Sequence, residues 1–214
     1  MQGPDTATQW LGHWLYDWGG ANTYLLLATQ RLWPNGLVWV PELLSAVGSY
    51  WGAPTVVILM LFWARVQVPH AKPLVAVGLC KFMFGLGLAL AAAALAKAVF
   101  ALPRPFVELG AGVYRATSAP DSRYTLPSGH AVYIGVLISA LWPLLRRYSR
   151  IGLLVLGAAV GWSRVVLGAH FPVDVVAGYL LGWACVACIT PCSQRLALRR
   201  SRAQPIDFRT EMKQ

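Results

Sequence analysis

The stretch "LVAVGLCKFMFGLGLALAAAALAKAVF" (residues 74–100) decides the fold, because it is long and apolar enough to cross a membrane. A spanning helix needs about 20 mostly apolar residues to cross about 30 Å of hydrocarbon. Four further segments have the same character, at residues 48–64, 130–145, 151–168 and 173–190. Their Gly and Ala residues suit close helix packing in lipid. The sequence therefore predicts an all-α integral membrane protein, a bundle of five or six transmembrane helices.

The composition agrees with a membrane protein. Of the 214 residues, 57% are hydrophobic and 12% charged, whereas soluble domains carry about 25% charged residues. We find no internal repeat, which favours a single domain. We expect an N-terminal amphipathic or first-span region at 1–47, a transmembrane domain at 48–194 and a basic cytoplasmic tail at 195–214.

The N-terminal region leaves two forms open. The stretch at 22–47 is apolar and rich in Trp, but Arg31, Pro34, Pro41 and Glu42 interrupt it. Both an amphipathic helix in the membrane interface and a kinked sixth span fit this pattern.

The predicted spans place the polar segments on defined membrane faces. Counting the crossings puts residues 101–129 and the turn at 168–172 on one face. The opposite face collects most basic loop residues: Arg65, Lys72, Arg146, Arg147, Arg150 and the arginines of the tail. Short basic loops stay in the cytoplasm, so we expect the first face to lie outside it. The net charge of +10 then reflects topology and contact with anionic lipid, and we expect no nucleic-acid partner.

Three polar stretches fall on that outer face. The first, "KAVFALPRP" (97–105), places Lys97 at the end of the long span, and two prolines stop the helix around Arg104. Taken alone, these cations fit snorkelling anchors.

The second stretch is "PSGH" (127–130), where a new span begins. Helix N-termini bind anions through free backbone N–H groups, and His130 adds a proton donor beside Ser128 and Gly129. Ser128 as an ordinary N-cap is the alternative.

The third stretch, "SRVVLGAHFPVD" (163–174), has Arg164 near the end of one span and Gly168 in a helix C-cap position. Asp174 lies four residues after His170, close enough to accept a hydrogen bond from the imidazole and orient it. Asp174 could instead only complement the helix dipole. Three cations and a helix N-terminus on one face describe a phosphate clamp.

Together, "KAVFALPRP", "PSGH" and "SRVVLGAHFPVD" resemble the three signatures of the type 2 phosphatidic acid phosphatase superfamily, KxxxxxxRP, PSGH and SRxxxxxHxxxD. All three match in order and without a departure across residues 97–174. The match is specific to the superfamily and weakly specific for substrate.

This resemblance implies a metal-independent phosphohydrolase with a phosphohistidine intermediate and no cofactor. It implies that His170 attacks phosphorus, that Asp174 holds its tautomer, and that His130 protonates the leaving oxygen and later activates water. It also implies which residues hold the phosphoryl oxygens: Lys97, Arg104, Ser128, Gly129 and Arg164.

Other ionisable groups are expected to lie outside the site. The acidic residues are too scattered for a Mg²⁺ cage. Cys185, Cys188 and Cys192 fit packed thiols better than a soft-metal site. We expect Lys81 to snorkel toward the cytoplasmic side, and residues 106–126 to cap the site as a loop.

The short chain and the compact spacing of the signatures resemble bacterial members of the superfamily that act on undecaprenyl pyrophosphate. This resemblance makes the leading hypothesis hydrolysis of that lipid to undecaprenyl phosphate, at the periplasmic or external face of a bacterial cytoplasmic membrane. Phosphatidylglycerophosphate, phosphatidic acid and lipid A phosphate remain open, as does phosphate transfer to another lipid. The non-enzymatic alternative is a protein that binds or transports a lipid phosphate. Binding alone does not need His130, His170 and Asp174, so these residues favour an enzyme.

Overall fold

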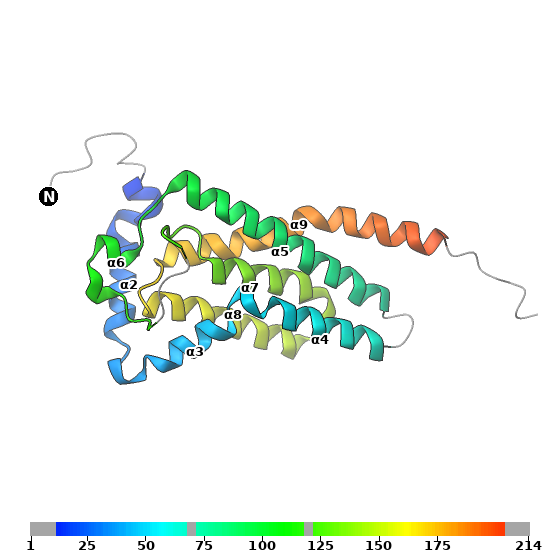
Figure 1. Ribbon diagram of the computed structural model, residues 1–214, viewed down its shortest axis with the longest axis horizontal. Helices are drawn as coiled ribbons and strands as arrows, with labels where there is room; N and C mark the ends of the chain where they lie inside the picture. Colours follow the sequence, from blue (N-terminus) through cyan, green and yellow to red (C-terminus); the bar gives the residue numbers. More distant parts are fainter. Residues whose placement is uncertain (1–11, 68–71, 118–121, 204–214) are drawn as a thin grey trace, which may run out of the picture.

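The structure is a computed structural model that describes residues 12–67, 72–117 and 122–203, with side chains described from Trp14 to Pro191 within these ranges. All regular elements in these ranges are helices, and Figure 1 shows the long ones side by side along the molecule. The predictions for residues 1–11, for the Cys192 side chain and for the arginines of the tail lie outside the described part.

Five helices form the bundle, in the order that the apolar segments predict. They are α4 (Ala53–Val66), α5 (Lys72–Phe100), α7 (Gly129–Leu141), α8 (Arg147–Val166) and α9 (Pro172–Ala203). By length and composition, Lys72–Glu108, Arg147–Val166 and Pro172–Pro191 can each cross a membrane. The predicted all-α membrane fold is confirmed.

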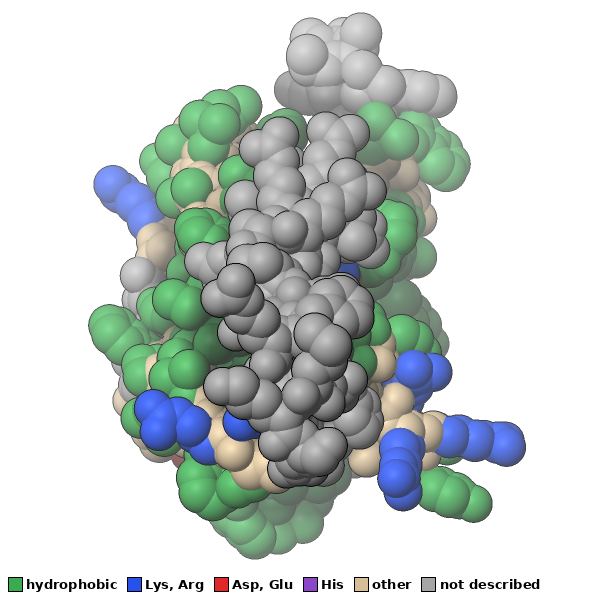
Figure 2. All heavy atoms as spheres, turned by 90° about the vertical axis from the view of Figure 1, so that its right-hand side faces the viewer, with side chains coloured by type: hydrophobic (Ala, Val, Ile, Leu, Met, Phe, Trp, Pro, Cys, Tyr) green, Lys and Arg blue, Asp and Glu red, His purple; other side chains and the backbone are tan. Residues whose placement is uncertain are grey.

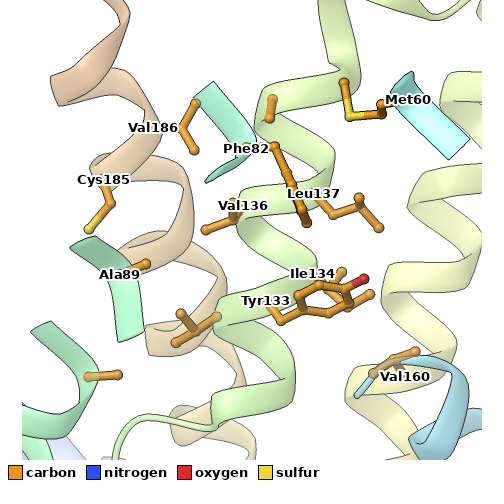
Figure 3. Close-up of a cluster of buried hydrophobic side chains, with 13 residues drawn as sticks. Met60, Phe82, Ala89, Tyr133, Ile134, Val136, Leu137, Val160, Cys185 and Val186 are labelled. Atoms are coloured by element: carbon orange, nitrogen blue, oxygen red, sulfur yellow. The ribbon is translucent and has the colours of Figure 1, made fainter. Parts of the chain in front are cut away.

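Helix α7 is the centre of the bundle and packs against α9, α5 and α8. Nine of its 13 residues are buried, so it is enclosed by protein where the other helices face lipid. Figure 3 shows Phe82 of α5, Tyr133 and Ile134 of α7, and Val160 of α8 in the resulting core. A 3-10 turn at Trp142–Leu144 ends the α7 segment. Its enclosure explains why so short a helix can remain inside the bundle.

Small residues allow α7 and α9 to approach closely. A Cβ atom at Gly135 of α7 would lie 2.6 Å from the backbone oxygen of Tyr179, and one at Gly178 of α9 would lie 2.7 Å from that of Ser128. Neither position can accept a larger residue without separating the two backbones. These contacts fix the start of α7, where "PSGH" lies.

The N-terminal region contains elements of both predicted forms. Helix α2 (Ala21–Arg31) lies across one end of the bundle (Figure 1). Helix α3 (Trp39–Val47) leads through a 3-10 turn at Tyr50–Gly52 into α4, and this apolar pair bends by 47°. The division of the chain after residues 47 and 194 stays a prediction.

The two ends of the bundle differ in character. Arg65, Lys72, Arg146 and Arg147 are exposed where α4 ends and where α5 and α8 begin. Figure 2 views the molecule from this side and shows Lys and Arg side chains around its margin. The opposite end carries α2, α6 (Pro105–Glu108) and the turn between α8 and α9 (Figure 1). The predicted gathering of the three polar stretches at one end is therefore present in the structure.

Candidate active site

A cavity of about 160 Å³ opens at the end of the bundle that carries α2 and α6. Six of the eight predicted site residues line it: Lys97, Arg104, Gly129, His130, Arg164 and His170. Tyr50, Leu90, Ala93, Ala94 and Ser122 complete the wall. Ser128 and Asp174 lie behind this wall and are fully buried. The two histidines therefore face one space, together with all three predicted cations.

The turn between α8 and α9 presents Arg164 and His170 to the cavity. Gly168 adopts a φ of 66°, a left-handed conformation that glycine adopts without the Cβ penalty. The amide of Ala169 donates to the Arg164 carbonyl at 3.1 Å and that of Gly168 to the Val165 carbonyl at 2.9 Å. This is a Schellman motif, so the predicted helix end at Gly168 is confirmed. It turns the chain directly after Arg164, so that His170 faces the same cavity.

Asp174 is held tightly in the first turn of α9. Its Oδ2 accepts hydrogen bonds from the Phe171 amide at 2.8 Å and from the Thr125 hydroxyl at 2.5 Å. Its Oδ1 accepts from the Tyr16 hydroxyl at 3.1 Å. The first contact caps the helix, as an acidic side chain three residues beyond the N-cap does. The carboxylate thus serves the fold and the site together.

The predicted pairing of His170 with Asp174 needs one correction. Nδ1 of His170 lies 3.5 Å from Oδ2 of Asp174, which is beyond the usual range of an N–H···O hydrogen bond. The Thr125 hydroxyl lies 3.2 Å from the same Nδ1. The carboxylate is therefore close enough to stabilise a charged ring, but its hydrogen-bonded link to the imidazole runs through Thr125.

Helix α7 begins at the cavity wall with Gly129 and His130. Ser128 occupies the N-cap position, yet its side chain makes no capping hydrogen bond. Its Oγ is buried without a hydrogen-bond partner in the structure, and leaving a hydroxyl in this state costs free energy. An ordinary N-cap serine does not account for this hydroxyl, whereas an anion bound at the helix N-terminus would engage it.

Lys97 turns inward at the end of α5. Its Nζ donates to the carbonyl oxygen of Tyr124 at 2.8 Å and approaches that of Thr125 at 3.4 Å. A snorkelling lysine would extend toward the membrane surface instead. These contacts tie Lys97 to the segment that precedes "PSGH".

The two arginines of the cavity are fixed by different neighbours. Arg104 is 2% exposed and donates from Nε to the Ser122 carbonyl at 2.7 Å, from Nη1 to the Ala169 carbonyl at 2.9 Å and from Nη2 to the Ser122 hydroxyl at 3.0 Å. Arg164 donates from Nη1 to the Ser45 hydroxyl at 2.5 Å. Arg104 thereby joins the loop before α7 to the turn before α9, and Arg164 joins α8 to α3.

The surroundings of His170 favour its neutral form. Burial lowers the pKa of His170 well below its ordinary value of 6.5, and the charges of Arg104, Arg164 and Lys97 lower it further. A hydrogen bond to the Thr125 backbone acts in the opposite direction and is outweighed. At neutral pH the ring therefore has one nitrogen with a free lone pair, as a nucleophile requires.

Several residues that support the site went unpredicted, and most lie in the N-terminal region. The Asn22 side chain accepts from the Val173 amide at 3.0 Å. Gln30 donates to the carbonyl oxygens of Val113 and Val166 at 2.7 and 3.0 Å. Together with the contact of Tyr16, which precedes α2, these bonds attach the N-terminal region to the two helix ends that flank the His170 turn. Their only sequence signal is that Asn22 and Gln30 interrupt an apolar helix eight residues apart.

The loop at 106–126 takes part in the site through its last residues. Ser122 lines the cavity, and Tyr124 and Thr125 contact Lys97 and His170. Arg115 instead donates to the Trp33 carbonyl at 3.0 Å, which attaches the loop to the N-terminal region. Lys81 is buried in α5 and does not line this cavity.

The donor set at the cavity consists of cations and imidazoles. Within the described ranges, no group of three or more His, Cys, Asp or Glu residues is arranged to hold a metal ion. The arrangement suits an anion that is held by fixed positive charge and approached by two imidazoles.

Comparison with known proteins supports the family that the three signature stretches indicate. The model of the PAP2 superfamily matches residues 78–197. The chain is 35% identical over 80 residues to phosphatidylglycerophosphatase B of Escherichia coli (strain K12), and this alignment covers 36% of this chain and 32% of that protein. It is 34% identical over 88 residues to an undecaprenyl-diphosphatase of Sulfolobus acidocaldarius, covering 41% and 42%. The chain thus spans about a third to two-fifths of the length of these curated relatives.

A solved structure shares the fold. The crystal structure of Aquifex aeolicus LpxE aligns with a TM-score of 0.66 at 18% identity, covering 82% of this chain and 95% of that chain. The residues that the family model matches, 78–197, contain all three signature stretches, helices α7 and α8, and most of α5 and α9. The chain belongs to the PAP2 superfamily.

Proposed function

We propose that this protein is a phosphatase that removes a phosphate group from a membrane lipid through a phosphohistidine intermediate. The observation that carries the proposal is that His130 and His170 line one cavity with Lys97, Arg104 and Arg164. Three cations around so small a space favour a ligand with more than one negative charge. The family, and the names of the relatives matched above, support the removal of a phosphate group from a lipid.

In the proposed reaction, Nε2 of His170 attacks phosphorus while the bond to the leaving oxygen breaks. Nδ1 keeps its proton, so the ring becomes positively charged, and the Asp174 carboxylate 3.5 Å away stabilises that charge. His130 gives a proton to the leaving oxygen and later takes one from the water that cleaves the N–P bond. The arginines and Lys97 hold the equatorial oxygens, where negative charge is spread in the transition state.

The cavity favours a substrate with a small charged head and an apolar body. Its volume is about 160 Å³. Pockets that enclose drug-sized ligands are larger, with volumes of about 300–1,000 Å³. Leu90, Ala93 and Ala94 of α5 form an apolar wall beside Lys97. A phosphoryl head enters such a site, and the attached tail stays in the bilayer.

Among lipids, we propose undecaprenyl pyrophosphate as the substrate and the outer face of a bacterial cytoplasmic membrane as the location. The exposed Arg and Lys residues at the opposite end of the bundle support that orientation. A cysteine placed at Val107, which is 61% exposed in α6, should react with an impermeant maleimide in intact cells. A cysteine at Tyr148, 84% exposed near the basic end, should not, and the reverse pattern would contradict the orientation.

The function is tested by phosphate release from a panel of purified lipids in mixed micelles with EDTA present. The panel comprises undecaprenyl pyrophosphate, phosphatidylglycerophosphate, phosphatidic acid and lipid A 1-phosphate. We expect release without added metal and the highest kcat/KM for undecaprenyl pyrophosphate. Release from glycerolipids alone would reassign the substrate, and binding without any release would leave the lipid-binding alternative.

A further inference from the structure

The residue that connects the proposed nucleophile to its carboxylate is Thr125. The Thr125 Oγ1 lies 3.2 Å from Nδ1 of His170 and 2.5 Å from Oδ2 of Asp174, while those two atoms are 3.5 Å apart. The hydroxyl is therefore inserted between the two side chains. All three residues are buried, and Thr125 is 0% exposed, so within the structure the hydroxyl itself makes the connection.

The direction of the two hydrogen bonds follows from counting protons. A hydroxyl has one hydrogen to donate and lone pairs to accept with. Asp174 also receives the Tyr16 hydroxyl and the Phe171 amide, and an ionised carboxylate accepts hydrogen bonds but donates none. The Thr125 hydrogen therefore points to Asp174. Its lone pair then faces His170, so the remaining hydrogen must be on Nδ1.

The backbone holds the Thr125 side chain in this position. Its amide donates to the Leu102 carbonyl at 3.0 Å, next to the "PRP" segment. Its carbonyl is approached by Nζ of Lys97 at 3.4 Å. Both contacts come from the first signature stretch, so the segment that carries Lys97 and Arg104 also positions the hydroxyl at His170.

We propose that Thr125 is a positioning residue that fixes His170 in the Nδ1–H tautomer, by accepting from Nδ1 and donating to Asp174. This inference rests on the proposed function, because the tautomer matters only if His170 is a nucleophile. In this tautomer Nε2 has a free lone pair on the side away from Thr125. When the N–P bond forms and the bond to the leaving oxygen breaks, Nδ1 keeps its proton and no proton moves through Thr125.

The kinetic test compares Thr125→Val with Thr125→Ser. Valine keeps the shape of threonine but removes the hydroxyl, and serine keeps the hydroxyl. We expect kcat to fall by about 10–100-fold in T125V, by analogy with the loss of a group that orients a metal-ligating histidine, with KM nearly unchanged. T125S should retain activity close to that of the natural protein, because serine keeps the hydroxyl. A T125V variant with the kcat of the natural protein would overturn the proposal, as would equal losses in both variants.

A direct readout keeps the proposal testable if T125V does not fold. In protein labelled with ¹⁵N-histidine, the imidazole nitrogen shifts distinguish the two neutral tautomers, and a His170→Gln variant assigns the signals. We expect Nδ1–H for His170 in the natural protein and in T125S, and a mixture in T125V. An Nε2–H tautomer in the natural protein would refute the inference. A natural protein that releases phosphate from no lipid, with His170 still in the Nδ1–H form, would instead refute the proposed function.

Discussion

Tyr16 donates its hydroxyl to Asp174 across 158 positions of sequence, at 3.1 Å. The ring of Tyr16 also packs edge-on against Phe171, with 5.9 Å between the centroids. The N-terminal region therefore contacts two residues that closely follow His170 in the chain. Burial and the neighbouring Asp174 carboxylate raise the pKa of Tyr16 above its usual range, so its hydroxyl remains a donor at every working pH.

We first expect Tyr16→Phe to lower kcat by about threefold to tenfold, which corresponds to about 0.7–1.4 kcal/mol in the barrier. The loss stays this small because Asp174 keeps two of its three donors. Activity of purified protein in micelles measures the change. Tyr24→Phe is the matched control, because Tyr24 is 69% exposed on α2. Equal activity of Y16F and Y24F would show that the Tyr16 contact is dispensable.

Replacing the proposed nucleophile separates chemistry from folding. We expect His170→Ala to abolish phosphate release, because no other group takes its place, while the thermal melting midpoint stays within a few degrees. Rapid acid-free quenching of the natural protein with ³²P-labelled substrate should trap label on histidine, and H170A should trap none. Turnover by folded H170A would refute the assignment.

His130 is expected to protonate the leaving group. The activity of His130→Ala should therefore be partly restored by a substrate whose leaving group departs without a proton. We predict that H130A loses about 10²–10⁴-fold in kcat on a lipid phosphate, the usual contribution of general acid–base catalysis. The loss should be much smaller on para-nitrophenyl phosphate, whose leaving group needs no proton. An equal loss on both substrates would argue against the role of general acid.

The buried state of His170 predicts a particular pH dependence. Because its pKa is well below 6.5, the ring of the free enzyme stays neutral as the pH falls through 6.5. The acid limb of kcat/KM, which reports the free enzyme, should therefore lie below pH 6.5. An acid limb at or above pH 6.5 that persists in variants of each of the other histidines would have to come from His170. It would contradict a buried, neutral nucleophile.

The same shift has a consequence for stability with a fixed sign. The unfolded chain protonates this histidine near pH 6.5, whereas the folded protein does not. The unfolded state thus binds more protons, and the free energy of unfolding should fall as the pH drops below 6.5. Thermal melting between pH 7 and pH 5 measures this loss, and H170A should show a weaker dependence.

The contact between α7 and α9 predicts which glycines tolerate a methyl group. Gly135→Ala places a Cβ 2.6 Å from the Tyr179 carbonyl oxygen, and we expect a loss of about 1–3 kcal/mol, as overpacking typically gives. Gly87→Ala on α5 is the control, because nothing lies within 4 Å of its Cβ position. Melting in micelles distinguishes them, and equal stability would mean that the two helices are not in close contact.

The bundle and most of the cavity wall were predictable because their signals are local. Runs of apolar residues mark helices, and the order of crossings puts alternate loops on the same face. The residues between these helices were then expected to meet, as Lys97, His130 and His170 do. Gly168 was predictable for a similar reason, since a helix that ends before a proline favours a left-handed glycine.

The supporting residues were not predictable because their partners are far away in sequence. Tyr16 and Ser45 each make one hydrogen bond to a site residue, and the Thr125 hydroxyl contacts two, His170 and Asp174. A single polar residue in an apolar or loop segment has no distinctive pattern. The direct bond between Asp174 and His170 was inferred from their spacing of four residues. Spacing fixes proximity within a turn but not whether a third side chain lies between.

The part of the cavity wall formed by α5 also bears on how far the proposed lipid substrate would move from the bilayer to reach the site. Leu90 and Lys97 both line the cavity, and seven residues of helix separate them by about 10 Å along its axis. A molecule lying against α5 meets a charge at one end of this interval and hydrocarbon at the other. For the lipid substrate proposed above, this arrangement would let the ester or anhydride bond reach the imidazole while the first carbons of the chain stay in the bilayer. Catalysis would then not require the lipid to leave the membrane.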